Sequence, residues 1–151
     1  MKPVLLDTNL LLLLAVGETD PGMIGRHKRL QIYELADFKW IQGAVSASAG
    51  LLLCPNVVSE TSNMVRYTNA ADAARIAIVL KAIVEQFPEN YLSSRVAVGS
   101  HVYHRLGVTD AVLLEIAEAG AVLITDDLDL ALAAAYAGTD VINYNHIRDN
   151  R

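Results

Sequence analysis

Four acidic residues of this chain lie in or beside apolar runs, where a carboxylate is difficult to keep charged. They are Asp7, Glu60, Asp110 and Asp127. Asp7 ends the apolar run Val4–Leu6, and Asp127 comes just after the apolar run 121–124. An acid in such a place loses its hydration unless a cation or hydrogen bonds replace the water. We therefore predict that the four carboxylates are the ligands of a divalent metal ion.

The type of ligand indicates which metal and which reaction. Converging carboxylates repel: two charges about 4 Å apart interact by about 4 kcal/mol at an effective dielectric constant of about 20. Either some of them take up protons or a cation neutralises them. Oxygen ligands without nearby His or Cys favour Mg²⁺ or Mn²⁺. Such an ion can activate a water and hold a phosphate oxygen, which phosphodiester hydrolysis requires.

Buried strands that alternate with helices must bring these acids together. We expect strands at 4–6, 50–54, 121–125 and 141–144. We expect helices at 10–16, 56–67, 70–87, 94–106, 110–119 and 128–137. This alternation predicts an α/β fold with a mainly parallel sheet, built as a single domain over residues 1–151.

Individual residues are expected to start or end these helices. Thr8 or Asn9 is predicted to cap the first helix, and Gly17 to end it. Thr109 is predicted to cap the helix that begins at Asp110. The stretch 18–43 is the most polar part of the chain and carries no predicted strand or helix.

The predicted topology places the four acids at one edge of the sheet. Asp7 and Asp127 lie just past the carboxyl ends of two strands, and Glu60 lies in the first turns of a helix that follows a third. Asp110 begins a helix that runs away from this edge, and the strand at 121–125 returns to it. Because ligand sites in open α/β sheets form at the carboxyl ends of the strands, we expect all four acids to converge there.

Other phosphate or metal sites fit the sequence less well. A haloacid-dehalogenase-type site begins with Asp-x-Asp, whereas the first strand here is followed by Asp7-Thr8-Asn9. The paired acids and late lysine of a response-regulator receiver are absent. The chain has no Walker A element, no Gly-x-Gly-x-x-Gly element and no Gly-x-Ser-x-Gly elbow. Its four histidines show no metal-ligand spacing.

The composition sets further bounds. The chain has 151 residues, of which 53% are hydrophobic, and 17 acids against 12 bases give a net charge of −5. There is no global basic signature for nucleic acid. The single Cys54 excludes an internal disulfide and fits a reducing compartment. No apolar run reaches the ~18 residues of a membrane span. We therefore expect a cytoplasmic protein without a membrane contact.

The mean hydropathy of +0.32 is high for a chain of this kind. This apolar surface is expected to be buried either in a compact core or against a second subunit. We expect a homodimer, and the apolar segment 128–137 is one surface on which it could form.

Four segments resemble, in order and spacing, the signature blocks of PIN domains. They are Leu5–Asn9, Val57–Glu60, Val108–Ala111 and Val122–Leu130, which together span nearly the whole chain. The resemblance implies a three-layer α/β/α sandwich that acts as a nuclease with Mg²⁺ or Mn²⁺. Many PIN domains are ribonucleases, including the toxins of VapC-like toxin–antitoxin pairs. RNA is then the implied substrate, and an antitoxin protein the implied partner of such a toxin.

Carried over by position, the resemblance makes the four acids a catalytic quartet. Asp7, Asp110 and Asp127 would hold the metal, and Glu60 would complete the cluster or orient the attacking water. Asp127 is preferred to Asp126 because it lies two residues after Thr125, as in the family pattern; Asp126 is expected to be solvated. The supporting residues would be Asn9 and Thr125 by resemblance, Asn63 on the Glu60 helix face, and Asp129 beside the fourth acid.

Basic residues complete the expected site. Arg26, Lys28 and Arg29 form the one dense basic run, and Arg105 precedes the Asp110 segment. We predict that these side chains contact RNA phosphates, with a solvated surface as the alternative for the run. The expected function is metal-dependent endoribonuclease cleavage that leaves 5′-phosphate and 3′-hydroxyl ends. The alternatives are a non-catalytic PIN-like module that binds RNA or protein, and a nuclease directed at DNA.

Overall fold

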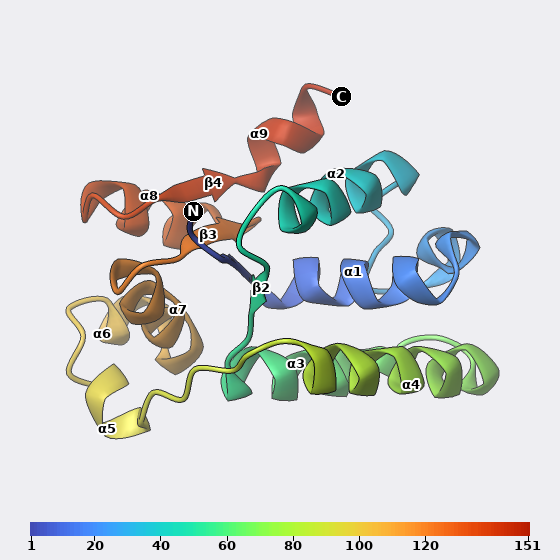
Figure 1. Cartoon of the computed structure of the whole chain (residues 1–151), viewed down its shortest axis with the longest axis horizontal. Coiled ribbons are helices and arrows are strands. Elements are labelled where there is room, and N and C mark those ends of the chain that lie inside the picture. Colours follow the sequence, from blue (N-terminus) through green and yellow to red (C-terminus); the bar gives the residue numbers. More distant parts are fainter.

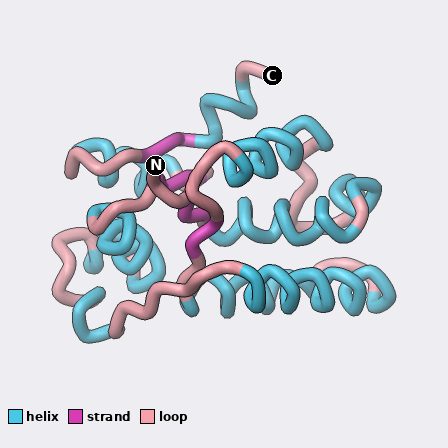
Figure 2. The backbone as a smooth tube through the Cα atoms, in the orientation of Figure 1, coloured by secondary structure: helices cyan, strands magenta, loops and turns pink.

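The computed structural model describes all 151 residues and has a parallel sheet among helices (Figures 1 and 2). The strands are β1 (Val4–Leu6), β2 (Leu51–Leu52), β3 (Val122–Thr125) and β4 (Val141–Asn143), in the order β2-β1-β3-β4. All three pairings are parallel. Leu6 pairs with Ile124, so β1 and β3 end side by side. The predicted α/β class with a parallel sheet is confirmed.

Nine α-helices and one 3₁₀-helix surround this sheet. They are α1 (Thr8–Thr19), η1 (Pro21–Arg26), α2 (Leu35–Ser46), α3 (Pro55–Val65), α4 (Ala70–Gln86), α5 (Ser94–Ala97), α6 (Tyr103–Leu106), α7 (Val108–Glu118), α8 (Leu128–Tyr136) and α9 (Tyr144–Asp149). Helix α1 packs against α2, α3 and α4, and α7 packs against α5 and α6. Helix α8 lies against β3 and β4. The carboxyl edge of the sheet therefore opens between the starts of α1, α7 and α8.

Helix α1 forms the centre of the core. Its residues Leu10–Val16 are at most 5% exposed, as expected for a helix that is apolar on all sides. Asp7, rather than Thr8 or Asn9, caps it, because its carboxylate Oδ1 accepts a hydrogen bond from the Thr8 backbone N–H at 2.7 Å. The first acid of the predicted site is thus also the residue that starts the central helix.

Gly17 does not end α1, which continues to Thr19. A Cβ atom built at Gly17 would lie 2.1 Å from Cδ1 of Phe38 on α2. The glycine is therefore needed for the close approach of two helices, and its role was mistaken for that of a helix terminator. The helix ends instead at Thr19, and the extended backbone of Asp20 leads into η1.

The polar stretch 18–43 contains η1 and most of α2, and it contributes to the core. Phe38 and Tyr33 are buried, and the Trp40 ring lies edge-on to Tyr144 at a centroid distance of 5.3 Å. The Tyr144 hydroxyl donates to the buried Asp37 carboxylate at 2.6 Å. This contact fastens the C-terminal helix α9, which the sequence pattern did not predict, to α2.

The predicted helix 94–106 is broken into α5 and α6. Between them the Ser100 hydroxyl accepts a hydrogen bond from the Val102 backbone N–H at 3.4 Å. A side chain that engages the backbone in this way competes with helical hydrogen bonding. Thr109 does not cap α7 either: the helix begins at Val108, preceded by Gly107 with a φ of 90°. The Thr109 hydroxyl is consequently free to bond elsewhere.

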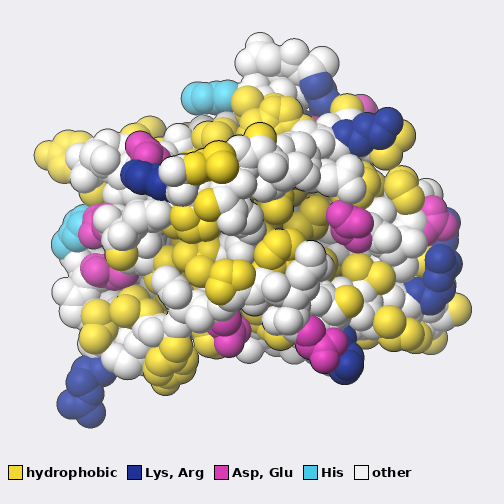
Figure 3. All heavy atoms as spheres, in the orientation of Figure 1, with side chains coloured by type: hydrophobic (Ala, Val, Ile, Leu, Met, Phe, Trp, Pro, Cys, Tyr) yellow, Lys and Arg dark blue, Asp and Glu magenta, His cyan; other side chains and the backbone are white.

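The surface carries no continuous basic stripe on the face seen in Figure 3. Hydrophobic side chains gather across the centre of this face, while Lys and Arg side chains are scattered around its rim. None of the helices is long and apolar enough to cross a membrane.

Candidate functional site

Asp7 and Thr125 meet at the carboxyl edge of the sheet. Asp7 follows β1 and Thr125 ends β3, so the parallel pairing of the two strands brings them together. The buried Thr125 hydroxyl donates to Oδ2 of Asp7 at 2.6 Å and accepts from the Asp127 backbone N–H at 3.0 Å. One hydroxyl therefore orients the first acid and the turn that carries the fourth. The Asp127 carboxylate itself caps α8 through the Leu130 N–H at 3.2 Å.

Glu60 is joined to two of the other acids by threonines. It lies exposed on α3, and its Oε2 accepts from the Thr8 hydroxyl at 2.9 Å. Its Oε1 accepts from the Thr109 hydroxyl at 3.3 Å. Thr8 and Thr109 directly neighbour Asp7 and Asp110 in the chain. The structure thus brings together all four acids that the sequence singled out, with three threonine hydroxyls around them.

Burial and mutual repulsion raise the pKa values of two acids of the cluster. Burial is the main cause that raises the pKa of Asp110 to about 8, followed by the charge of Asp7, a hydrogen bond with Asp127 and the charge of Glu60. Burial also raises the pKa of Asp7 to about 6, against the hydrogen bonds from Thr125 and Thr8, which lower it. The acids therefore form one electrostatic unit with an excess of negative charge.

Asp126 is half-buried and held by hydrogen bonds, whereas the sequence suggests a solvated side chain. Its Oδ2 accepts hydrogen bonds from the Asn9 amide at 3.1 Å and from the Tyr33 hydroxyl. Its backbone carbonyl accepts from the Asn145 amide at 2.7 Å. This arrangement leaves Oδ1 of Asn9 buried without a hydrogen-bond partner. Asp126 thus holds Asn9 and ties the turn before Asp127 to helix α9.

Several residues of this network were not found from the sequence. The Arg148 guanidinium donates from Nη2 to Oδ1 of Asn145 at 2.7 Å and lies 5.8 Å from the centroid of the Tyr33 ring. Neither Asn145 nor Arg148 follows a buried strand with an acid beside it, so no local signal marks them. Thr8 stands within the Asp7-Thr8-Asn9 block, and its place beside Asp7 could have suggested its role.

Two predicted supporting residues are not brought to the acids by hydrogen bonds. Asn63 and Asp129 are exposed and make no side-chain hydrogen bond. Their supporting roles stay predictions. Thr125 and Asn9, by contrast, contact Asp7 and Asp126 directly.

The basic run lies at the other end of α1 from Asp7. Helix α1 has 12 residues and is therefore about 18 Å long. The basic run begins at Arg26, the last residue of η1, which follows the C-terminal end of α1. Arg26 pairs with the buried Asp72 carboxylate at 2.6 Å, and Arg29 lies 5.6 Å from the centroid of the Tyr67 ring. Lys28 is exposed, as is Arg105 on α6. Arg26 thus has a structural partner, whereas Lys28 and Arg105 have none.

The oxygen donors of the cluster are of the kind that binds a hard cation, although the side chains are not already arranged around one metal position. No three His, Cys, Asp or Glu side chains are placed to hold a metal ion together. The available donors are carboxylate oxygens and the buried, unpaired Oδ1 of Asn9. Oxygen donors of this kind fit Mg²⁺ or Mn²⁺. A cation would also relieve the repulsion that contributes to the raised pKa values of Asp7 and Asp110.

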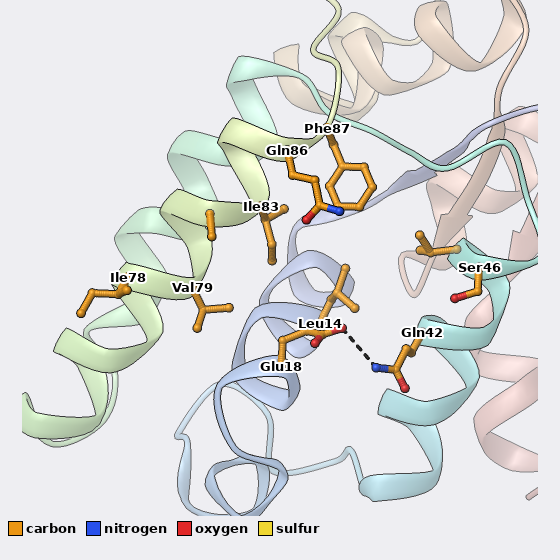
Figure 4. Close-up of a pocket in the computed structure, with 11 residues that line it drawn as sticks. Leu14, Glu18, Gln42, Ser46, Ile78, Val79, Ile83, Gln86 and Phe87 are labelled. Atoms are coloured by element: carbon orange, nitrogen blue, oxygen red, sulfur yellow. Dashed lines mark hydrogen bonds between the residues drawn. The ribbon is translucent and has the colours of Figure 1, made fainter.

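The largest cavity of the protein does not include the acids. It measures about 460 Å³ and lies between α1, α2 and α4, with Leu14, Ile83 and Phe87 among its lining (Figure 4). Across it, the Gln42 amide donates to the Glu18 carboxylate at 3.2 Å. A smaller cavity of about 350 Å³ adjoins the cluster instead.

Comparisons with known proteins assign no family to this geometry. No protein-family model, curated protein or solved structure matches the chain. Function is therefore inferred from the four carboxylates and from the side chains that hold them.

Proposed function

We propose that the chain is a Mg²⁺- or Mn²⁺-dependent endoribonuclease with a three-layer α/β/α fold of PIN-domain type. The observation that supports this most is the convergence of Asp7, Glu60, Asp110 and Asp127 at the carboxyl edge of a parallel sheet. Their mutual charges contribute to the raised pKa values of Asp7 and Asp110. A protein that only needed stability would gain from replacing such a cluster, because like charges close together destabilise the fold.

In this proposal Asp7, Asp110 and Asp127 hold the cation, with Asn9 Oδ1 as a nearby neutral donor. When bound, the cation would polarise a water and offset the negative charge that develops on the phosphate. The cluster is suited to the cation because its carboxylate oxygens outnumber the hydrogen-bond donors of the protein around them. Asp110, with a pKa of about 8, would otherwise carry a proton for most of the time at pH 7.

The remaining residues position the acids and the water. Thr125 holds Oδ2 of Asp7, and Thr8 and Thr109 hold the two oxygens of Glu60. Because each Glu60 oxygen has further lone pairs and the side chain is exposed, Glu60 can accept a hydrogen bond from the attacking water and orient it. In-line attack by that water on the phosphorus atom leaves a 5′-phosphate and a 3′-hydroxyl.

Partners belong to the same proposal. The resemblance of the four segments to PIN-domain blocks supports an antitoxin as a protein partner. A homodimer is supported by the exposed apolar side chains Leu128, Leu132 and Tyr136, which recur every four residues on α8. Sedimentation of wild type and Leu132→Glu tests the dimer: the wild type is expected to sediment as a dimer and the variant as a monomer, and equal mass for both contradicts this surface.

A cleavage assay tests the proposed activity. Mixed single-stranded RNA and matching DNA are incubated with the chain in Mg²⁺, Mn²⁺ or EDTA. We expect metal-dependent cleavage of RNA, with 5′-phosphate ends. A preparation of Asp7→Asn made in parallel controls for contaminating ribonucleases. Cleavage that persists in EDTA contradicts the proposal, as does RNA binding without cleavage, which indicates a non-catalytic module. Equal cleavage of DNA indicates the broader nuclease.

A further inference from the structure

A cavity of about 350 Å³ lies next to Glu60, at the side of the acidic cluster. It is lined by Pro55, Asn56, Ser59, Tyr91, Leu92, Ser94 and Thr109. Thr109 also donates to Glu60 at 3.3 Å, and Ser59 is the residue before Glu60. A ligand in this cavity would therefore be in reach of the acidic cluster. The volume falls within the range of small-ligand pockets, about 300–1,000 Å³.

The lining combines an exposed aromatic ring with free polar groups. Tyr91 is 80% exposed although it is a large aromatic side chain. The side chains of Asn56, Ser59 and Ser94 take part in no hydrogen bond within the protein, so their donors and acceptors are available. Proteins bind single-stranded nucleic acid by stacking bases on aromatic rings and by hydrogen bonding to their exposed edges. Both elements are present here.

The segment that carries Tyr91 is anchored on both sides. The Leu53 N–H donates to the Pro88 carbonyl at 2.9 Å, and the Asn90 N–H donates to the Leu53 carbonyl at 2.8 Å. These bonds attach the segment to the extension of β2. After Tyr91, Ser93 caps α5 through the Val96 N–H at 3.3 Å. The backbone that carries the Tyr91 ring is therefore already ordered, and a ligand that stacks on the ring need not order it.

We propose that this cavity is a nucleotide subsite, in which Tyr91 stacks on a base next to the scissile phosphate and Asn56 hydrogen-bonds its edge. The assignment of RNA as the ligand rests on the proposed function. The subsite gives the chain a preference for certain bases at one position beside the cut. An amide can pair with donors and acceptors on a base edge, whereas a tyrosine ring accepts any base.

Binding without catalysis tests the subsite independently of cleavage. A fluorescent ten-nucleotide single-stranded RNA of mixed sequence is titrated with the full chain in EDTA, and anisotropy is measured. Tyr91→Ala should weaken binding about 5- to 100-fold, because stacking on one aromatic ring contributes about that factor. Tyr91→Phe keeps the ring and should bind within twofold of wild type. Ile78→Ala removes an exposed apolar side chain on α4, away from this cavity, and should also bind as wild type.

Three results overturn the subsite. They are an unchanged affinity for Tyr91→Ala, a loss for Tyr91→Phe as large as that for Tyr91→Ala, and no measurable RNA binding by the wild type. Because Tyr91 is exposed, its replacement is not expected to lower the melting temperature. A fall in melting temperature that accounts for the lost binding also counts against the subsite.

Cleavage of an RNA panel varied at one position beside the cut separates this inference from the proposed function. With Mn²⁺, Asn56→Ala should raise KM and broaden the base preference, with kcat little changed. If the wild type cleaves but Tyr91→Ala binds normally, the nuclease proposal stands and the subsite is wrong. If the wild type does not cleave but the Tyr91 series weakens binding as expected, the subsite stands and the nuclease proposal is wrong.

Discussion

The hydroxyl of Thr125 donates a hydrogen bond of 2.6 Å to the carboxylate of Asp7, from the end of one strand to the end of its neighbour. The same oxygen accepts the Asp127 backbone N–H at 3.0 Å. This donor lowers the pKa of Asp7, in opposition to the burial that raises it to about 6. One threonine thus sets the geometry and partly the ionisation of the edge at which the acids gather.

Replacing Thr125 by the isosteric apolar residue valine should lower both the stability of the fold and the rate of RNA cleavage. Thr125→Val is expected to lower the free energy of unfolding by about 1–3 kcal/mol, because a buried carboxylate and an N–H lose their partner. Thr125→Val should also lower kcat at least tenfold. Thr125→Ser keeps the hydroxyl and should retain most of the stability and most of the activity of wild type. Urea denaturation and RNA cleavage measure the two effects.

Thr61 supplies the matched control. It is fully buried on α3, and its hydroxyl has no hydrogen-bond partner. Thr61→Val should therefore be neutral or stabilising. If Thr61→Val and Thr125→Val destabilise the protein equally, the loss at Thr125 reflects packing and not the hydrogen bond to Asp7.

Removing one negative charge from the cluster should abolish cleavage. Asp7→Asn and Asp110→Asn are each expected to lower kcat/KM for RNA at least 100-fold, because the cation loses a charged ligand. Circular dichroism should show an unchanged fold. The control Asp140→Asn makes the same chemical change at an exposed acid that pairs with Lys2 at 2.7 Å, and its activity should match wild type. Near wild-type cleavage by Asp7→Asn or Asp110→Asn is incompatible with the site.

Metal should stabilise the fold measurably. Binding contributes RT ln(1 + [L]/Kd), or about 2.7 kcal/mol at 100 times Kd, which raises Tm by several degrees. A thermal-shift series in EDTA, Mg²⁺ and Mn²⁺ measures this. Asp7→Asn should melt higher than wild type in EDTA and gain less from metal, because it has already lost part of the repulsion. If neither Mg²⁺ nor Mn²⁺ changes the Tm of wild type or of Asp7→Asn, the four acids do not form one metal site.

Stability without metal should depend on pH in a defined direction. The folded-state pKa values of Asp7 and Asp110 are about 6 and about 8, above the ordinary aspartate value of 3.8. Between about pH 4 and pH 8 the folded protein therefore binds more protons than the unfolded chain. The free energy of unfolding should consequently decrease as pH rises through this window. For Asp7 alone, the full loss is roughly 3 kcal/mol.

The decisive measurement is the difference between wild type and Asp110→Asn in EDTA from pH 5 to pH 8. Burial lowers the pKa of His27, so that residue increases stability as pH rises toward 6.5, and it does so in both proteins. Subtraction therefore isolates the carboxylate. The variant should be increasingly more stable than wild type toward pH 8, and a constant difference across the range refutes the raised pKa.

The basic run should separate into a structural and an RNA-binding part. Arg26→Ala removes the partner of the buried Asp72 carboxylate and should lower Tm. Lys28→Ala should raise KM with little change in kcat, and should reduce the slope of log affinity against log salt by about 1. Lys81→Ala, at an exposed lysine on α4 paired with Glu85, is the control and should leave the slope unchanged. A slope unchanged in Lys28→Ala identifies the run as a solvated surface.

The sequence by itself determined the parts of this protein that depend on local pattern. Short apolar runs located all four strands, and the spacing of apolar residues located α4 and α7, because burial imposes these periods on neighbouring residues. The four acids could be placed at one edge of the sheet for the same reason: each stands at the end or start of a locally recognisable element. Thr125 was singled out through the PIN-domain resemblance, and in the structure its hydroxyl donates to Asp7.

Only the tertiary structure decided the features that arise between distant segments. The internal place of Gly17 in α1 depends on Phe38 of another helix. The hydrogen bonds of Asp126 depend on the hydroxyl of Tyr33 and the amide of Asn145, which come from other elements of the fold. Such contacts leave no period in the sequence, because each is formed by one residue of a segment whose neighbours point elsewhere. The cavity that joins Tyr91 to Asn56 arises in the same way, when the segment after α4 folds back along β2.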